Sequence, residues 1–246
     1  SMYKENYFID AAKLPDNSTH IWRYMDFVKF ASLIDKSELY FCRSDKFEDP
    51  AEGSFPELCT ADKICTTEEL KKHISQTSFN FRKQTHINCW HQNDYESAGM
   101  WNLYAKDNRG IAILSTIGKL KESIIDSRNV YIGKVKYIDY KKDQIPYGDF
   151  FSPFFYKRMS FAHENEIRAL VETSDDLPLK DGHPDYSIDI HLHGLGIKVD
   201  LKKMIEAIYI APFAPSWFVE LVKSFNNKYG YNFPMRQSLL ADPAMF

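Results

Sequence analysis

The chain of 246 residues lacks the features that mark a membrane or secreted protein. No apolar run approaches the ~18 residues that a membrane-spanning helix needs, so we expect no membrane association. The start of the chain, Ser1 to Lys4, lacks the apolar region of a secretory signal peptide. Only four cysteines occur and none forms a C-x-x-C pair, which favours reduced thiols and a cytoplasmic protein.

A strong charge of one sign and the common catalytic motifs are also missing. The net charge is −3, and no run of Lys or Arg is longer than two residues. A non-specific nucleic-acid binder usually carries a basic stripe, so we expect no general nucleic-acid binding. No P-loop, G-x-G-x-x-G, G-x-S-x-G or H-E-x-x-H is present, so no single motif indicates a reaction.

Aromatic residues, in contrast, are plentiful. They make up 15% of the chain, with 18 Phe, 15 Tyr and 4 Trp. Such side chains bury large areas, so we expect most of them in a thick core. The alternative is a pocket that stacks a flat ligand such as a nucleotide base or nicotinamide. The length of the chain and its hydrophobic content of 44% are sufficient for a buried core.

Hydrophobic periodicity predicts an α+β fold in a single globular domain over residues 1–246. Short or alternating apolar runs predict strands at 19–25, 38–42, 87–91, 111–114, 130–140, 164–172, 207–210 and 235–240. Helices are predicted after the N-cap Asp26, from the capping box Thr66-x-x-Glu69 to residue 83, at 96–106 and 215–229, and in part of 150–161. Because strands do not alternate with helices, we expect mixed, mostly antiparallel sheets with flanking helices. Residues 1–17 are expected as an N-terminal extension, and 174–196, which contain several Pro and Gly, as a long surface loop with one short strand.

The first predicted strand carries Trp22-Arg23-Tyr24. In alternation Arg23 shares a face with Ile21 and Met25, and a charge among apolar neighbours is costly unless it is paired. Arg23 is therefore either a structural residue bonded to a carboxylate or a clamp for a phosphate or carboxylate ligand. The planar guanidinium suits bidentate contact with such anions. Arg23 and Tyr24 are candidate ligand-binding residues.

The loop predicted at 43–56 contains Asp49-Pro50-Ala51-Glu52. Carboxylates this close together could bind a metal or act in acid–base chemistry. The simpler interpretation, which we favour, is a turn capped by Asp49 beside solvated glutamates. Asp49 and Glu52 are kept as candidate ligand-binding residues.

The helix predicted at 96–106 places Ser97, Met100, Trp101 and Tyr104 on one face. This face is expected to belong mostly to the core, and we expect Trp101 to be largely buried. The polar atoms of Ser97, Trp101 and Tyr104 need partners if they are buried. These three residues are candidates for lining a ligand site.

A late segment holds Lys157 and, in the predicted strand, Glu164-Asn165-Glu166-Ile167-Arg168. With a period of two, Glu164, Glu166 and Arg168 share one strand face. This pattern indicates either a solvated face with paired charges or catalytic carboxylates held by a neighbouring Arg. Glu164 and Glu166 are the candidate catalytic residues, with Lys157 and Arg168 as candidate ligand-binding residues.

Three histidines, His183, His191 and His193, lie in the predicted surface loop. An H-x-H pair could bind zinc, but no Cys or acidic pair is spaced to complete a tetrahedral site. We therefore predict no metal centre there.

Taken in order, these pieces resemble an uncharacterised bacterial family, the domain of unknown function numbered 2971. The resemblance covers residues 20–171, with Trp22-Arg23-Tyr24, Phe47-x-Asp49-Pro50-x-Glu52, Met100-Trp101-x-x-Tyr104 and Glu164-x-Glu166-x-Arg168, and a looser tail at 207–212 and 236–238. The usual family form has Asn before the Asp-Pro, where this chain has Glu48. The resemblance implies that one site or one structural network contains Arg23, Asp49, Glu52, Trp101, Tyr104, Glu164 and Glu166.

The order of elements is also similar to that of the ADP-ribosyltransferase superfamily: an Arg on an early strand, aromatic and Ser-bearing elements in the middle, and a late E-x-E strand. This similarity implies NAD as a substrate, with no metal required. Arg23 would hold the pyrophosphate, and Ser97 or Tyr104 would line the nicotinamide pocket. Glu166 would stabilise the positively charged ribosyl transition state.

Two alternatives stay open at this point. Asp49, Glu52, Glu164 and Glu166 could hold Mg²⁺ in a nuclease or phosphoesterase, with Lys157 on the scissile phosphate. The chain could also be a ligand-binding or interaction module without catalysis. The partner expected in the preferred interpretation is a small-molecule nucleotide, and the sequence indicates no particular protein partner.

Overall fold

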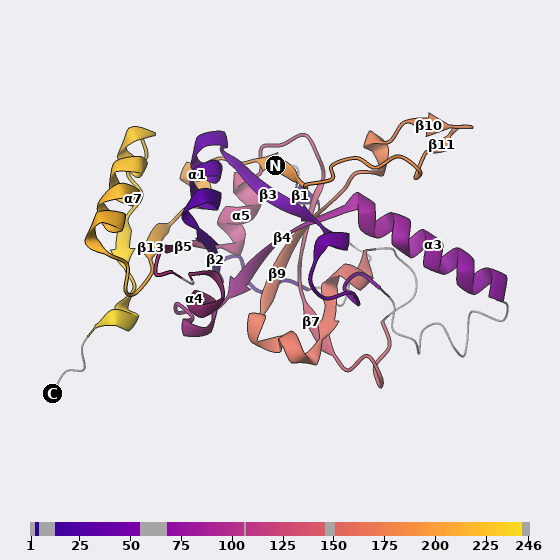
Figure 1. The fold of residues 1–246 in the computed structure, drawn as a ribbon, viewed down its shortest axis with the longest axis horizontal. Helices are drawn as coiled ribbons and strands as arrows, with labels where there is room; N and C mark the ends of the chain where they lie inside the picture. The colour runs from indigo at the N-terminus through magenta and orange to yellow at the C-terminus, as the bar shows by residue number, and fades with distance from the viewer. Residues whose placement is uncertain (1–2, 5–12, 55–67, 106, 146–150, 243–246) are drawn as a thin grey trace.

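The computed structural model describes residues 3–4, 13–54, 68–105, 107–145 and 151–242 (Figure 1). A long sheet has the order β1-β6-β9-β4-β2-β5-β13-β14, and β3 joins it by pairing with β4 and β12. Its strands are β1 (Tyr3–Lys4), β2 (His20–Asp26), β3 (Glu38–Arg43), β4 (Thr85–Gln92), β5 (Gly110–Thr116), β6 (Val130–Lys134), β9 (Glu166–Glu172), β12 (Leu195–Lys198), β13 (Ala207–Ile210) and β14 (Met235–Gln237).

This sheet is mixed and mostly antiparallel, as the sequence predicts. The β1–β6 and β13–β14 pairs are parallel, and the other strand pairs of the sheet are antiparallel. Two small sheets accompany it: β7 (Lys136–Ile138) pairs with β8 (Tyr156–Arg158), and β10 (Leu179–Lys180) pairs with β11 (His183–Pro184). The α+β class is therefore confirmed.

The helices lie against the sheet and at its two ends. They are α1 (Phe27–Lys36), α3 (Glu68–Gln84), α4 (Ala98–Tyr104), α5 (Ile117–Ser123), α6 (Leu201–Met204) and α7 (Ser216–Lys228). Helix α7 lies beside α1 at one end, while α3 extends from the opposite end (Figure 1). The Phe27 ring meets the rings of Phe218 and Phe225 at 5.7 and 5.6 Å between centroids, so α1 and α7 share one aromatic core.

The bounds and the buried face of helix α1, which borders the site, follow from local sequence signals. The Asp26 carboxylate accepts a hydrogen bond from the Lys29 backbone N–H at 2.8 Å, as its predicted N-cap role requires. The helix ends at Ser37, which takes the left-handed φ of 52°. Phe30, Leu33 and Ile34 are buried on the face predicted from the periodicity.

Two predicted strands differ from the structure near Glu166. The predicted strand 130–140 is divided into β6 and β7, because β6 pairs with β9 and β9 begins only at Glu166. The last bond of this ladder runs from Val135 N to Glu166 O at 2.9 Å. The strand predicted at 164–172 begins only at Glu166 in the structure. The reason is that Asn165 takes φ 39° and ends a 3₁₀ turn over Met159–Glu164. Glu164 therefore lies on that turn and not on the strand.

Other boundaries differ by shorter lengths. The predicted helix 96–106 begins at Ala98 with Ser97 as its N-cap, and the strand predicted at 235–240 ends at Gln237. Residues 3–4 of the predicted extension pair with β6, and 174–196 contain the β10–β11 pair and the start of β12. The segment 150–161 contains 3₁₀ turns around β8. Helices α5 and α6 were not predicted, and Thr66 of the capping box lies outside the described residues.

Candidate functional site

The candidate site lies where β2 and β3 separate along one edge of β4. At one end of β4, Ile87 pairs with Cys42 of β3, and at the other end His91 pairs with Trp22 of β2. Between these ladders β4 has no strand partner on this side among the described residues. The separation leaves room for a cavity within the sheet.

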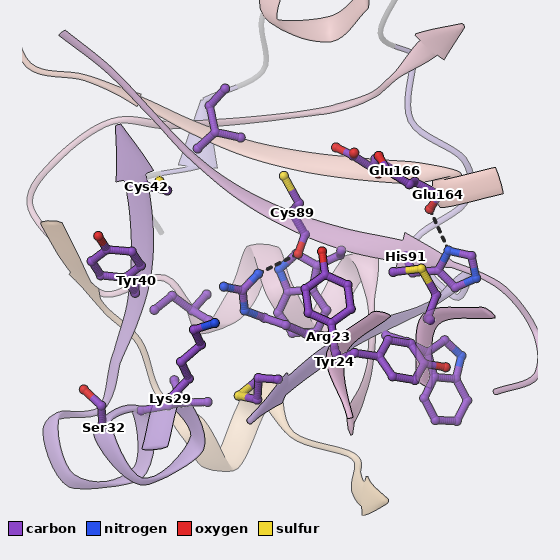
Figure 2. Close-up of a pocket in the computed structure, with 18 of the residues that line it drawn as sticks. Arg23, Tyr24, Lys29, Ser32, Tyr40, Cys42, Cys89, His91, Glu164 and Glu166 are labelled. Carbon is purple, nitrogen blue, oxygen red and sulfur yellow. Dashed lines mark hydrogen bonds between the residues drawn. The ribbon is translucent and has the colours of Figure 1, made fainter. Parts of the chain in front are cut away.

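Two side chains bridge this gap. The Arg23 guanidinium donates from Nη1 to the carbonyl oxygen of Cys89 at 2.6 Å (Figure 2). Asn88 donates from Nδ2 to the carbonyl oxygen of Tyr40 at 2.8 Å. These bonds satisfy backbone carbonyls that the separated strands cannot reach.

A cavity of about 630 Å³ occupies the gap, which is a volume typical of small-molecule sites. One part is lined by α1 and β3, including Lys29, Glu38 and Tyr40. The other part is lined by Tyr104 and by the carboxylate-bearing Glu164 and Glu166. In Figure 2, Tyr40 and the two glutamates lie on opposite sides of the view, and Arg23 lies between them.

Arg23 reaches this cavity by an unexpected path. Alternation places Glu166 on the same sheet face as Trp22, because Trp22 pairs with His91 and His91 with Glu166. Arg23 therefore starts from the opposite face. Its guanidinium nevertheless lines the same cavity as Glu166, because the separation of β2 from β3 opens the sheet beside it. Among the described residues, no carboxylate lies within ion-pair distance of Arg23, and burial lowers the pKa of its guanidinium.

The predicted late segment forms a buried network of charges. Lys157 donates from Nζ to Glu166 at 2.9 Å, to Glu164, and lies 4.0 Å from a Glu52 oxygen. Arg168 pairs with Glu166 and Glu52 and donates to the carbonyl of Phe154 at 2.8 Å. Glu52, Lys157, Glu166 and Arg168 are all buried. The predicted solvated face is therefore wrong for these residues, and Glu52 is not one of the solvated glutamates expected beside the turn.

The network holds three carboxylates for two cations. Burial of the Glu164 side chain, together with the hydrogen bond and charge of Glu166, raises the pKa of Glu164 to about 7, even though Lys157 contacts it. Arg168 and the hydrogen bond from Glu164 hold the pKa of Glu166 well below its usual value, although burial acts in the opposite direction. Near neutral pH, Glu166 is therefore a carboxylate, whereas Glu164 is partly protonated.

Neighbouring groups fix these two glutamates in place. The Glu166 backbone N–H donates to the Tyr137 hydroxyl at 2.9 Å. His91 lies across the strand pair from Glu166, and its Nδ1 lies 2.6 Å from the carbonyl oxygen of Glu164 (Figure 2). A carbonyl only accepts, so His91 carries its proton on Nδ1 in this contact.

Two predicted residues, Ser97 and Trp101, support Tyr24, which lines the cavity. The Ser97 backbone N–H donates to the Tyr24 hydroxyl at 2.7 Å, and the Trp101 ring meets the Tyr24 ring edge-on at 5.0 Å. Trp101 is 3% exposed, as the helix pattern predicts, and its Nε1 donates to Glu96 at 2.9 Å. Ser97 and Trp101 lie behind the cavity wall, while Tyr104 forms part of it and is 46% exposed.

Asp49 is held away from the cavity wall. Its carboxylate pairs with Arg158 at 2.6 and 3.0 Å and also accepts from the Ala51 backbone N–H at 3.0 Å. It therefore caps its turn, as we favoured from the sequence. Each of Asp49, Glu52, Glu164 and Glu166 contacts Lys157, Arg158 or Arg168.

Several lining residues were not predicted. Lys29, Glu38, Tyr40, Cys89 and His91 all border the cavity. The alternation of Glu38, Tyr40 and Cys42 along β3 is visible in the sequence. Any half-buried strand shows the same pattern, so it does not indicate a site. Their place in a site follows from the separation of β2 and β3, which is a long-range feature.

The remaining predictions concern metal and membrane. His191 bonds Asp176 through Nε2 at 2.7 Å, whereas His183 and His193 are exposed. In the described ranges, no group of three or more His, Cys, Asp or Glu is placed to hold a metal ion. None of the described helices has the length and apolar character needed to cross a membrane.

Comparison with protein-family models finds no match, and comparison with curated protein sequences finds none either. Among solved structures, the chain is similar to DarT from Thermus sp. 2.9 in complex with carba-NAD+, with 7% identity and a TM-score of 0.41 over 92% of this chain and 97% of that chain. A second structure of that DarT, in complex with ADP-ribosylated ssDNA, gives 7% identity and a TM-score of 0.41 over 94% of this chain and 98% of that chain. At this TM-score the likeness assigns neither a fold family nor a function to the chain.

Proposed function

We propose that this chain is an ADP-ribosyltransferase-like enzyme that binds NAD in the cavity between β2, β3 and β4. The observation that carries the proposal is the charge arrangement of one cavity. Arg23 is a cation without a carboxylate partner among the described residues, and the Glu164–Glu166 pair borders the same space. NAD carries both an anionic pyrophosphate and a cationic nicotinamide ring, so it complements both ends.

Arg23 is suited to the pyrophosphate. Its Nη1 is fixed by the Cys89 carbonyl, which leaves the other N–H groups of the guanidinium for a ligand. In Figure 2 the Lys29 side chain extends toward the Arg23 guanidinium. Lys29 pairs with Asp26 at 3.2 Å and lines the cavity, so it adds a positive charge at the cavity edge.

Glu166 is suited to the developing positive charge. When the bond between ribose C1′ and the nicotinamide nitrogen breaks, its electron pair goes to the ring nitrogen and positive charge develops on the ribose. A carboxylate fixed by Lys157 and Arg168 stabilises that charge without having to reorient. When Glu164 is ionised, the network has one more carboxylate than cations, which favours a cation over an anion at this end of the cavity.

Glu164 is suited to proton transfer. An acceptor nucleophile that attacks C1′ loses a proton, and the carboxylate form of Glu164 can take it. Its pKa of about 7 lies close to the pH at which a general base is most effective. Glu164 is also more exposed than Glu166, with side-chain exposures of 20% and 8%.

We further propose that the chain belongs to the domain family numbered 2971, on the basis of the residues that carry the resemblance.

The test measures binding and turnover separately. Thermal unfolding is followed with NAD, with ADP-ribose and with Mg²⁺ or Mn²⁺, and a ligand at a hundred times its Kd stabilises the folded state by ~2.7 kcal/mol. Release of nicotinamide from NAD is then measured for the wild type and for Glu166→Gln. We expect stabilisation by NAD, and release that Glu166→Gln abolishes while NAD still binds.

Glu220→Gln is the matched control, because Glu220 is exposed on α7. It should release nicotinamide at the wild-type rate. Stabilisation by divalent ions alone, or nicotinamide release that survives Glu166→Gln, contradicts the proposal. Because Glu166 is buried between two cations, both variants are assayed below the unfolding temperature of the less stable one.

A further inference from the structure

The end of the cavity opposite the glutamates is lined by β3, whose outer edge pairs with β12. Glu38, Tyr40 and Cys42 alternate along β3 and line the cavity, as does the buried Leu39, while Phe41 and Arg43 are buried and do not line it. Strand β12 pairs with β3, with Gly196 opposite Tyr40 and Lys198 opposite Glu38. The positions of the Tyr40 and Glu38 side chains therefore depend on the residues of β12 that lie next to them.

Two glycines, Gly194 just before β12 and Gly196 within β12, make space for Tyr40 and Glu38. A Cβ atom at Gly194 would lie 2.6 Å from the Tyr40 hydroxyl and 2.7 Å from its Cζ, and it would also meet the Phe41 carbonyl. A Cβ atom at Gly196 would overlap the carboxylate end of Glu38. Each side chain thus leans diagonally across a glycine of the neighbouring strand. Glycine within a strand often marks such a close approach.

The Tyr40 ring and the Glu38 carboxylate both remain available to contact a ligand. Tyr40 is 50% exposed although its phenol end is covered by Gly194. The Glu38 carboxylate has no ion-pair partner in the part of the chain that the structure describes. An aromatic ring stacks on a flat heterocycle, and a carboxylate accepts hydrogen bonds from N–H groups.

We propose that Tyr40 and Glu38, seated on Gly194 and Gly196, form a second subsite that binds an amino-bearing purine base. This inference rests on the proposed function and specifies it further, since it assigns the residues that bind the purine half of NAD. The base binds at Tyr40, the pyrophosphate at Arg23, and the reacting ribose at the Glu164–Glu166 end. The order of these residues across Figure 2 fits the order of those groups along NAD.

The test compares two ligands that share the reacting half. Calorimetry measures the Kd of NAD and of nicotinamide mononucleotide for the wild type and for Tyr40→Ala. We expect the variant to lose about 10-fold or more in NAD affinity, the size of one base–aromatic stack, while its affinity for the mononucleotide changes less than about 2-fold. Tyr40→Phe keeps the ring and should bind NAD like the wild type.

Two controls separate this contact from general effects. Tyr95→Ala removes a ring that is 79% exposed and does not line the cavity, so it should bind both ligands normally. Gly194→Ala should lower NAD affinity selectively, whereas Gly182→Ala should not. Both glycines have similar positive φ angles, 87° and 82°, but a Cβ atom at Gly182 meets nothing within 4 Å. The strain of the positive φ is therefore matched, and the two variants differ in the contacts that the new Cβ atom makes with Tyr40 and with the Phe41 carbonyl.

The outcomes distinguish this inference from the proposed function. If the wild type binds neither ligand, the proposed function is wrong and the subsite has no basis. If the wild type binds NAD but Tyr40→Ala weakens both ligands equally, or neither, the subsite is wrong and the proposed function stands. A selective loss of NAD affinity supports both.

Discussion

Arg23 and Cys89 are joined across the gap between β2 and β3 by a hydrogen bond of 2.6 Å from Nη1 to the carbonyl oxygen. The bond satisfies a backbone acceptor that none of the described strands reaches, and it fixes the guanidinium in the cavity. The sequence left two roles open for Arg23, a structural partner or an anion clamp. One side chain can fill both, because a guanidinium has five N–H donors and this bond uses one.

The first prediction concerns the shape of that donor group. Arg23→Lys should weaken NAD binding by at least ~1.5 kcal/mol, because an ammonium cannot bind the carbonyl and a phosphate in the bidentate geometry of the fork. Calorimetric titration with NAD measures the change. Arg109→Lys is the control, since Arg109 is an exposed residue paired with Asp107, and its Kd should stay at the wild-type value. Unchanged affinity in Arg23→Lys would show that Arg23 does not contact the anion.

Trp101 provides a test of the cavity support. Trp101→Ala removes a ring that is 3% exposed and packs edge-on against Tyr24, so it should lower the free energy of unfolding by ~3–5 kcal/mol. Urea denaturation measures this loss. Leu103→Ala, on the same helix but 48% exposed, should cost ~0.5 kcal/mol or less. Equal losses in the two variants would contradict the placement of Trp101 in the core.

The buried charge network predicts a rescue. Arg168→Met leaves Glu52 and Glu166 with only Lys157 between them, and removal of one partner from a buried pair costs ~3–5 kcal/mol. Adding Glu52→Gln removes the excess negative charge and should restore ~1 kcal/mol or more. Chemical denaturation of the two single variants and the double variant gives the coupling energy.

Arg109→Met tests whether charge removal alone explains such a loss. Arg109 and Asp107 are an exposed pair, so the variant should change stability by ~0–1 kcal/mol. If Arg168→Met and Glu52→Gln are simply additive in the double variant, the carboxylate and guanidinium do not interact as the structure indicates.

The parts of the fold that the sequence predicts well are set by local signals. Asp26 begins α1, Phe30 and Ile34 face the core, and the strand at Ala207–Ile210 has the predicted bounds. Capping and periodicity act within a few residues, so they are visible in the chain itself. The candidate residues Arg23, Tyr24, Tyr104, Glu164 and Glu166 border one cavity, although the sequence identifies them only by their chemistry and not by their proximity.

What the sequence does not predict depends on pairing between distant segments. The cavity exists because β4 pairs with β3 at Ile87 and with β2 at His91, and no local pattern encodes that separation. The roles of Gly194 and Gly196 depend on the register of β12 against β3, so both were interpreted as loop residues. Alternation predicts Glu164 on the strand because it cannot show that Asn165 takes a left-handed conformation.

The last prediction follows from the pKa of Glu164, which the folded state raises from 4.5 to about 7 mainly through burial and the neighbouring Glu166. Below pH 4.5 the group is protonated in both the folded and the unfolded state. As the pH rises toward 7, the unfolded chain releases this proton first, so the contribution of Glu164 to stability falls, by at most ~1.4 kcal/mol per pH unit. The difference in unfolding free energy between the wild type and Glu164→Gln should therefore decline over this window and level off above it, as urea denaturation at a series of pH values would measure. The exposed Glu220→Gln should show no such decline relative to the wild type. A difference that instead rises between pH 4.5 and 7 would mean that the Lys157 contact governs Glu164 and keeps it a carboxylate, and Glu164 could not then hold the proton that we assign to it.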